Sequence, residues 1–159
     1  MAILTVLRNI FLIFALCVSF SIYADAQKHP AKVAPNVDTI DRLVKNSGYE
    51  YTVYGKGVWT IQSGTNVVMI GGGADIMVAF MAIADKGKFQ ITAESMLEML
   101  KLGSKLDHVK FIIDDQGDLA VRSDSRLRLM DKGGFDDVIV RVINGYEKAT
   151  AKIAPYLIK

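Results

Sequence analysis

IMVAFMAIA, residues 76–84, is the most apolar strand candidate after the N-terminal region, and the rest of the fold can be derived from it. In an extended chain, successive side chains point to opposite faces of the sheet. Both faces of this stretch are apolar, so the strand requires cover on both sides. One side carries Ile76, Val78, Phe80, Ala82 and Ala84, and the other carries Met77, Ala79, Met81 and Ile83.

Further strands precede this one. Residues 49–54 and 58–62 are rich in β-branched and aromatic side chains, and they flank the hairpin turn GKG at residues 55–57. A second turn leads into a strand at residues 67–70, and the glycines at residues 71–73 are expected to interrupt the chain between this strand and the next. The pattern predicts a short antiparallel meander that ends in residues 76–84.

A helix follows the meander. Thr92 is a residue that caps helices well, and Gly103 marks the end of the segment. Between them, Met96, Leu97 and Leu100 are spaced as one apolar stripe. We therefore expect a helix over this segment that packs through these three side chains.

A second hairpin comes next. Residues 109–114 and 119–130 flank a polar turn, and the second of these strands alternates between apolar and polar residues. Alternation of this kind predicts one packed face and one face in water. The packed face carries Leu119, Val121, Leu127 and Leu129, and the other carries Arg122, Asp124, Arg126 and Arg128.

Helices also open and close the domain. Asn36 is a candidate cap and Gly48 a candidate stop for a first helix, and Asp131 or residues 133–134 open a last helix that Pro155 ends. The order is α-β-β-β-β-α-β-β-α, which indicates an α+β fold with an antiparallel sheet packed by helices on one side. The last helix carries a long apolar stripe of Phe135, Val138, Ile139, Val142, Ile143, Tyr146, Ala149 and Ile153.

The N-terminus predicts export. Arg8 precedes an apolar run at residues 10–22 that is shorter than a membrane span, and Ala24-Asp25-Ala26 fits a signal peptidase site. We expect a signal peptide at residues 1–26, a tether at 27–36 and one domain at 37–159, in the periplasm or outside the cell. An uncleaved membrane anchor is the alternative; after cleavage we expect no membrane association.

Composition and motifs exclude several classes of function. The net charge of +2 lacks the concentrated basic surface that nucleic acid requires. The single cysteine, Cys17, leaves with the signal peptide, so a zinc site would lack ligands. GGGAD at residues 71–75 lacks the Gly-Lys-Ser/Thr of a phosphate loop, and DDQGD at residues 114–118 lacks the spacing of a calcium loop. We expect no metal, no cofactor and no catalytic site.

The order of elements resembles a known family. After the helix, LDHVKF at residues 106–111 leads into the hairpin VKFIIDDQGDLAVRS at residues 109–123, and the last helix closes with APYL at residues 154–157. Over residues 37–157 this resembles the YbjN family, whose fold is similar to that of type III secretion chaperones. The resemblance implies a non-enzymatic domain, often dimeric, with a sheet able to bind a partner segment.

The methionines supply a candidate binding surface, because thioether side chains adapt to irregular partners. We expect an exported protein-binding or chaperone-like module that self-associates, or binds an extended partner, through an apolar sheet face. One alternative is a small-ligand module that binds an anion through Arg122, Arg126 and Arg128, and another is an enzyme centred on His108 or residues 114–118. The expected partner-binding residues are Met69, Met77, Val78, Phe80, Met81 and Ile83.

Overall fold

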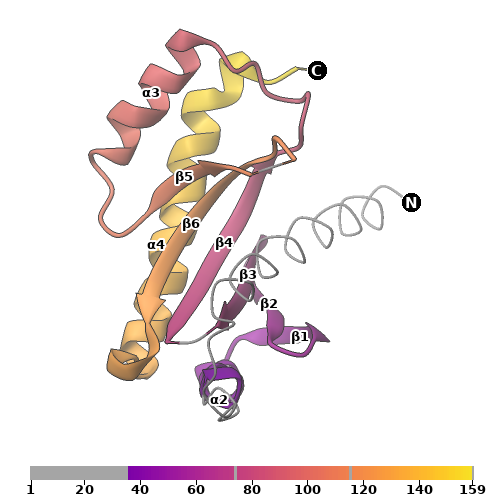
Figure 1. The fold of residues 1–159 in the computed structure, drawn as a ribbon, viewed down its shortest axis with the longest axis vertical. Coiled ribbons are helices and arrows are strands. Elements are labelled where there is room, and N and C mark those ends of the chain that lie inside the picture. The colour runs from indigo at the N-terminus through magenta and orange to yellow at the C-terminus, as the bar shows by residue number, and fades with distance from the viewer. Residues whose placement is uncertain (1–35, 74, 115, 159) are drawn as a thin grey trace, which may run out of the picture.

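The computed structural model describes residues 36–73, 75–114 and 116–158, and Figure 1 shows their arrangement. The signal peptide predicted at residues 1–26 lies outside the described residues, as does the tether predicted at residues 27–36 apart from Asn36. Within the described residues, every helix is too short or too polar to span a membrane.

The elements follow the predicted α-β-β-β-β-α-β-β-α order, with two short 3₁₀ helices added. In chain order they are α2 (Asn36–Ser47), β1 (Glu50–Gly55), β2 (Val58–Ser63), β3 (Asn66–Gly73), β4 (Ile76–Ala84), α3 (Ala93–Gly103), β5 (Lys110–Ile113), β6 (Leu119–Arg126), η1 (Leu127–Leu129), α4 (Lys132–Ile153) and η2 (Ala154–Tyr156).

The described strands form one six-stranded antiparallel sheet in the order β1-β2-β3-β4-β6-β5. Strand β4 pairs with β3 on one side and with β6 on the other, and it thereby joins the meander to the second hairpin. Met77, for example, lies opposite Gly72 of β3 and Ser125 of β6. The predicted α+β class with an antiparallel sheet is confirmed.

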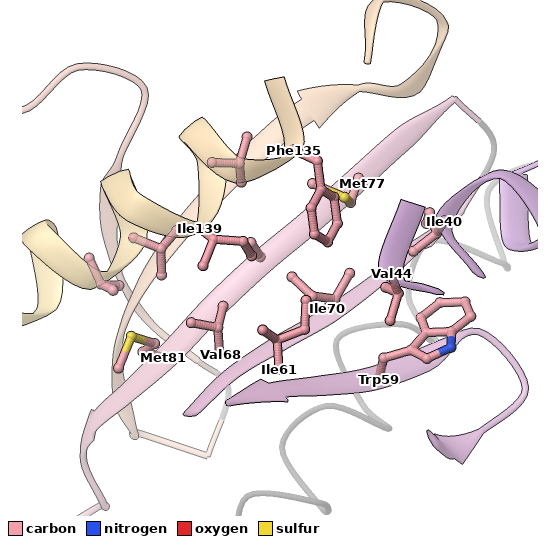
Figure 2. Close-up of a cluster of buried hydrophobic side chains, with 14 of the residues drawn as sticks. Ile40, Val44, Trp59, Ile61, Val68, Ile70, Met77, Met81, Phe135 and Ile139 are labelled. Atoms are coloured by element: carbon pink, nitrogen blue, oxygen red, sulfur yellow. The ribbon is translucent and has the colours of Figure 1, made fainter. Parts of the chain in front are cut away.

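The helices pack on one face of this sheet. Figure 2 shows Phe135 and Ile139 of α4 and Ile40 and Val44 of α2 gathered with Met77 in one buried cluster. Full burial of each large apolar side chain is worth about 1.5–3 kcal/mol, so this cluster is the main source of stability. The strands contribute Trp59, Ile61, Val68, Ile70, Ala79, Met81 and Val121 to it.

The longest helix, α4, follows its sequence pattern closely. Asp131 is the cap, and its Oδ1 accepts a hydrogen bond from the backbone N–H of Gly134 at 2.8 Å. The predicted apolar stripe faces the sheet, because an amphipathic helix buries the side that carries its apolar residues. Phe135, Val138, Ile139, Val142, Ala149 and Ile153 are buried, and Ile143 and Tyr146 are half-buried.

The glycines at residues 71–73 do not interrupt the chain as predicted, because they are the last residues of β3 and pair with β4. Gly72 faces α2. A Cβ at this position would lie 2.7 Å from Cδ1 of Ile40 and would also clash with the carbonyl oxygen of Ile76. Glycine is therefore required here by the close approach of the β4 backbone and of α2, and not by a turn.

Strand β6 is shorter than predicted. It ends at Arg126, because the backbone N–H of Leu127 donates to the carbonyl of Asp75 at 3.0 Å and the chain then enters η1. The alternation predicted through residue 130 is therefore wrong beyond residue 126. Leu127 is buried, but Leu129 is 79% exposed, although the alternation placed both on the packed face.

Helix α3 has the predicted bounds and cap. Thr92 Oγ1 accepts a hydrogen bond from the backbone N–H of Ser95 at 3.1 Å, and the Ser95 hydroxyl accepts one from the Thr92 N–H. The predicted stripe is wrong, however, because α3 packs against α4 through Met99. Leu97 and Leu100 are 50% and 69% exposed.

Candidate partner-binding surface

Strand β4 divides the predicted partner-binding residues between two faces. Met77 and Met81 point toward α4 and belong to the main core, and Ile83 packs against that core from the same face. The side chains of Met77 and Met81 are 0% and 5% exposed. These three residues therefore support the fold, and partner binding has to be considered for the opposite face.

Met69, Val78 and Phe80 lie on that opposite face, which we call the open face. Met69 of β3 is directly opposite Phe80 of β4, and both contact Ala120 in a small cluster. Among the described residues, no helix packs on this face, since the clusters that contain α2, α3 and α4 contain none of these three residues. The apolar character of the face comes from Val58, Val67, Met69, Ile76, Val78, Phe80, Ile112 and Ala120.

The accessible apolar area is unevenly distributed over the open face. Met69 and Phe80 are nearly buried, at 4% and 5% exposure, whereas Val67 and Ile76 are 41% and 44% exposed. Val78 is half-buried, and its neighbour on β3 is Gly71, which has no side chain. A partner would therefore gain most of its binding free energy from contact with the exposed side chains at the two ends of the open face.

Charged residues border the open face along β6 and β5. Register places Arg122 opposite Phe80, Asp124 opposite Val78 and Arg126 opposite Ile76. Asp124 accepts a hydrogen bond from Arg122 Nε at 2.6 Å and another from Lys110 Nζ. Burial alone would raise the pKa of Asp124, but these two cations outweigh it, and the pKa is lowered.

The predicted anion-binding arginines are in three different settings. Arg122 is paired with Asp124, whereas Arg126 is exposed at the end of β6. Arg128 lies beyond the strand in η1, with its Nε 3.9 Å from Oδ2 of Asp75. Because the strand ends between Arg126 and Arg128, the three do not continue one alternating stripe; anion binding remains a prediction.

The acidic hairpin has a clear structural role. Oδ1 of Asp114 accepts hydrogen bonds from the backbone N–H groups of Gln116 and Asp118, both at 2.9 Å. Asp118 is buried and accepts a hydrogen bond from the backbone N–H of Lys86; burial raises its pKa. Within the described residues, no group of three or more His, Cys, Asp or Glu side chains is arranged to hold a metal ion.

His108, the other candidate for chemistry, is exposed in the loop between α3 and β5 and has a φ of +57°. A positive φ is uncommon for a residue with a side chain, and it is found in turns as well as at functional sites. The chain reverses here between helix and strand. The bond of Lys110 to Asp124 immediately follows, so the loop leads directly into the charged border of the open face.

Sequence reasoning missed two groups of exposed apolar residues. Val67 and Ile76 on the open face were not among the predicted site residues. Each is two residues away from a predicted residue on the same face of its strand, Met69 for Val67 and Val78 for Ile76. Leu97 and Leu100 on α3 were assigned to the core. The signal for the second group is that α3 carries apolar residues on more than one side, Met96, Leu97, Met99, Leu100 and Leu102.

Comparison with known proteins shows that this chain shares its fold with several solved structures. No family model and no curated protein matches the chain. A chain of the heterodimeric ExoU–SpcU complex from the type III secretion system of Pseudomonas aeruginosa is similar with a TM-score of 0.59 and 16% identity, over 73% of this chain and 98% of that one. YbjN from E. coli is similar with a TM-score of 0.56 and 13% identity, over 80% and 98%.

A third similar structure is the type III secretion chaperone SycH of Yersinia pestis in complex with a fragment of YscM2. Its TM-score is 0.52 and its identity 15%, over 73% of this chain and 98% of that one. At such identities the likeness shows the fold alone. It agrees with the fold that the resemblance to YbjN and the type III secretion chaperones implied.

Proposed function

We propose that this chain is a protein-binding, chaperone-like module whose open face holds a segment of a partner protein. The observation that carries the proposal is the apolar open face, on which Val67 and Ile76 are 41% and 44% exposed and which no described helix covers. Together with the half-buried Val58, Val78 and Ile112, they give the face accessible apolar area on several strands, which is a common property of interaction surfaces.

Proteins of similar fold support the proposal. ExoU–SpcU is a heterodimeric complex, SycH is in complex with a fragment of YscM2, and ExsC is in complex with ExsE. The role that we transfer to this chain is the general one, binding of another protein chain, and not any of those partners. Binding of a chain segment requires no catalytic residues, so we propose a binding protein and not an enzyme.

The proposal includes export. Cleavage after Ala26 would release a chain that starts at Gln27, in the periplasm or outside the cell. Intact-mass measurement of the protein recovered from the cells that make it tests this step. The expected mass is that of residues 27–159, and the mass of the full chain would support the membrane-anchor alternative.

Binding is tested with an unfolded probe, reduced and carboxymethylated α-lactalbumin, and with two matched variants. Ile76→Glu places a charge on the open face, and Leu129→Glu places the same charge on an apolar side chain outside it that is 79% exposed. Full burial of an isoleucine is worth about 1.5–3 kcal/mol, so the exposed 44% of Ile76 supplies about 1 kcal/mol. We expect at least fivefold weaker binding for Ile76→Glu and no change for Leu129→Glu; equal effects would refute the proposal.

Self-association is a second candidate, and α3 favours it. Leu97 and Leu100 lie one turn apart on this helix and are both at least half exposed. If two copies meet through α3, Leu100→Glu should convert a dimer to a monomer in sedimentation equilibrium, and Ile76→Glu should not. The reverse result would place self-association on the open face.

A further inference from the structure

Charge is distributed unequally across the open face. On the β6 and β5 side the face carries Arg122, Arg126 and Lys110, with Asp124 among them. On the β1 and β2 side it carries neutral polar residues and one carboxylate, Glu50, at the start of the edge strand. A partner that covers the face therefore meets cations along one of its borders.

Asp124 does not neutralise this border. It forms ion pairs with both Arg122 and Lys110, so one negative charge is shared by two positive charges. Among the described residues, none forms an ion pair with Arg126. The four side chains together carry three positive charges and one negative charge.

The register places one of these cations against an exposed apolar residue that a partner would contact. Arg126 is directly opposite Ile76, which is 44% exposed, whereas Arg122 is opposite Phe80, which is only 5% exposed. Side chains in such pairs have Cβ atoms about 4.5–5.5 Å apart. A partner side chain that packs on Ile76 therefore lies beside the exposed side chain of Arg126.

Removal of water from an unpaired cation is costly, and the cost is offset only if the partner supplies an opposite charge. We propose that the segment held on the open face carries carboxylates beside its apolar side chains, and that these pair with the Arg122 and Arg126 border. This inference rests on the proposed function. It adds the chemical class of the partner: an acidic, apolar segment.

The strand geometry indicates how the carboxylates are spaced. Arg122 and Arg126 are four residues apart on one strand, which corresponds to about 13 Å. An extended partner segment presents same-side residues at the same repeat, so acidic residues at positions i and i+4 fit the two arginines. Position i+2 would lie near Asp124 and should be neutral or basic.

The test uses two synthetic peptides with identical apolar residues and serine at position i+2. One has glutamate at positions i and i+4, and the other has glutamine at both. Fluorescence anisotropy with the whole protein should show at least tenfold tighter binding of the glutamate peptide at low ionic strength. Because exposed charges are screened by salt, the preference should shrink in about 0.5 M salt, where the Debye length is only a few ångströms.

Two charge-reversed variants separate the local effect from the net charge. Arg126→Glu should abolish the preference for the glutamate peptide, and Arg128→Glu, which changes the net charge equally but lies in η1 outside the face, should keep it. Equal loss of preference in both variants would overturn the inference.

The remaining outcomes separate the inference from the proposed function. If both peptides bind equally and Ile76→Glu weakens both, the acidic-partner inference is wrong and the proposed function stands. If neither peptide binds, and the unfolded α-lactalbumin probe does not bind either, both are wrong. If the probe binds and neither peptide does, the acidic-partner inference is wrong.

Discussion

Gly72 offers a test of how little room α2 and the start of β4 leave above β3. It lies in β3 beneath the helix, and a Cβ there would sit 2.7 Å from Cδ1 of Ile40 while also clashing with the carbonyl oxygen of Ile76. A Cβ on the adjacent Gly73 would have no neighbouring atom within 4 Å, so Gly73 is the matched control. Neither glycine has a positive φ, so alanine strains neither backbone.

The magnitude follows from the two contacts. In both variants alanine lowers the entropy of the unfolded chain relative to glycine, which stabilises the fold by about 0.4–1 kcal/mol. Overpacking costs about 1–3 kcal/mol, and the upper end applies at Gly72 because a backbone carbonyl cannot move aside as a flexible side chain can. We therefore expect Gly73→Ala to be neutral or slightly stabilising and Gly72→Ala to be less stable than it by about 2–3 kcal/mol.

Urea unfolding of the two variants measures this difference, provided that the slope of the free energy against urea is unchanged. Combination with Ile40→Val, which removes Cδ1, should recover part of the loss, and a coupling of about 1 kcal/mol is typical for residues in contact. If Gly72→Ala and Gly73→Ala unfold within about 0.5 kcal/mol of each other, neither the Ile76 carbonyl nor Ile40 of α2 lies as close to Gly72 as described, and the reasoning fails.

Three further predictions concern other contacts. Gly145→Ala should destabilise α4 by about 1 kcal/mol, because its Cβ would lie 2.9 Å from Cγ1 of Val109 and this outweighs the better helix propensity of alanine; a higher melting temperature would contradict it. Thr92→Ala should cost about 1 kcal/mol by removing the bond to Ser95, with faster hydrogen exchange in the first turn of α3; unchanged exchange would contradict it. The fold lowers the pKa of Asp124, so its ion pairs stabilise the folded state fully above the ordinary pKa of about 3.9. This stabilisation is lost as the pH falls through the lower pKa of the folded state. The free energy of unfolding lost in Asp124→Asn, measured by urea titration, should therefore be constant from about pH 7 to 5 and shrink below about pH 4.

Features that depend on a few neighbouring residues were predicted well from the sequence. The cap at Thr92 is a bond between residues three apart, and the stop at Gly48, with a φ of +88°, is a property of one residue. Helix α4 has one apolar side, which is buried, and one polar side. In each case a few neighbouring residues determine the local structure, and segments far away in the chain do not change it.

The candidate site was predicted less well, because β4 is apolar on both sides. Nothing in residues 76–84 distinguishes the face with Met77 from the face with Val78. The choice depends on α4, whose apolar stripe packs on the Met77 side about 55 residues later in the chain. For the same reason Leu97 and Leu100 were assigned to the core, although α3 reaches α4 through Met99.

The order of the strands and helices, the caps of α3 and α4, and the absence of a polar face on the central strand were all predictable from short stretches of sequence. These follow from periodicity and turn chemistry, which act over a few residues. Three features appear only in the folded chain: which side of that strand the helices cover, the position of the preceding glycines inside a strand beneath a helix, and the position of Arg126 opposite the exposed Ile76. These features depend on contacts between segments far apart in the chain, because an apolar side chain is buried only where the surface of another segment covers it.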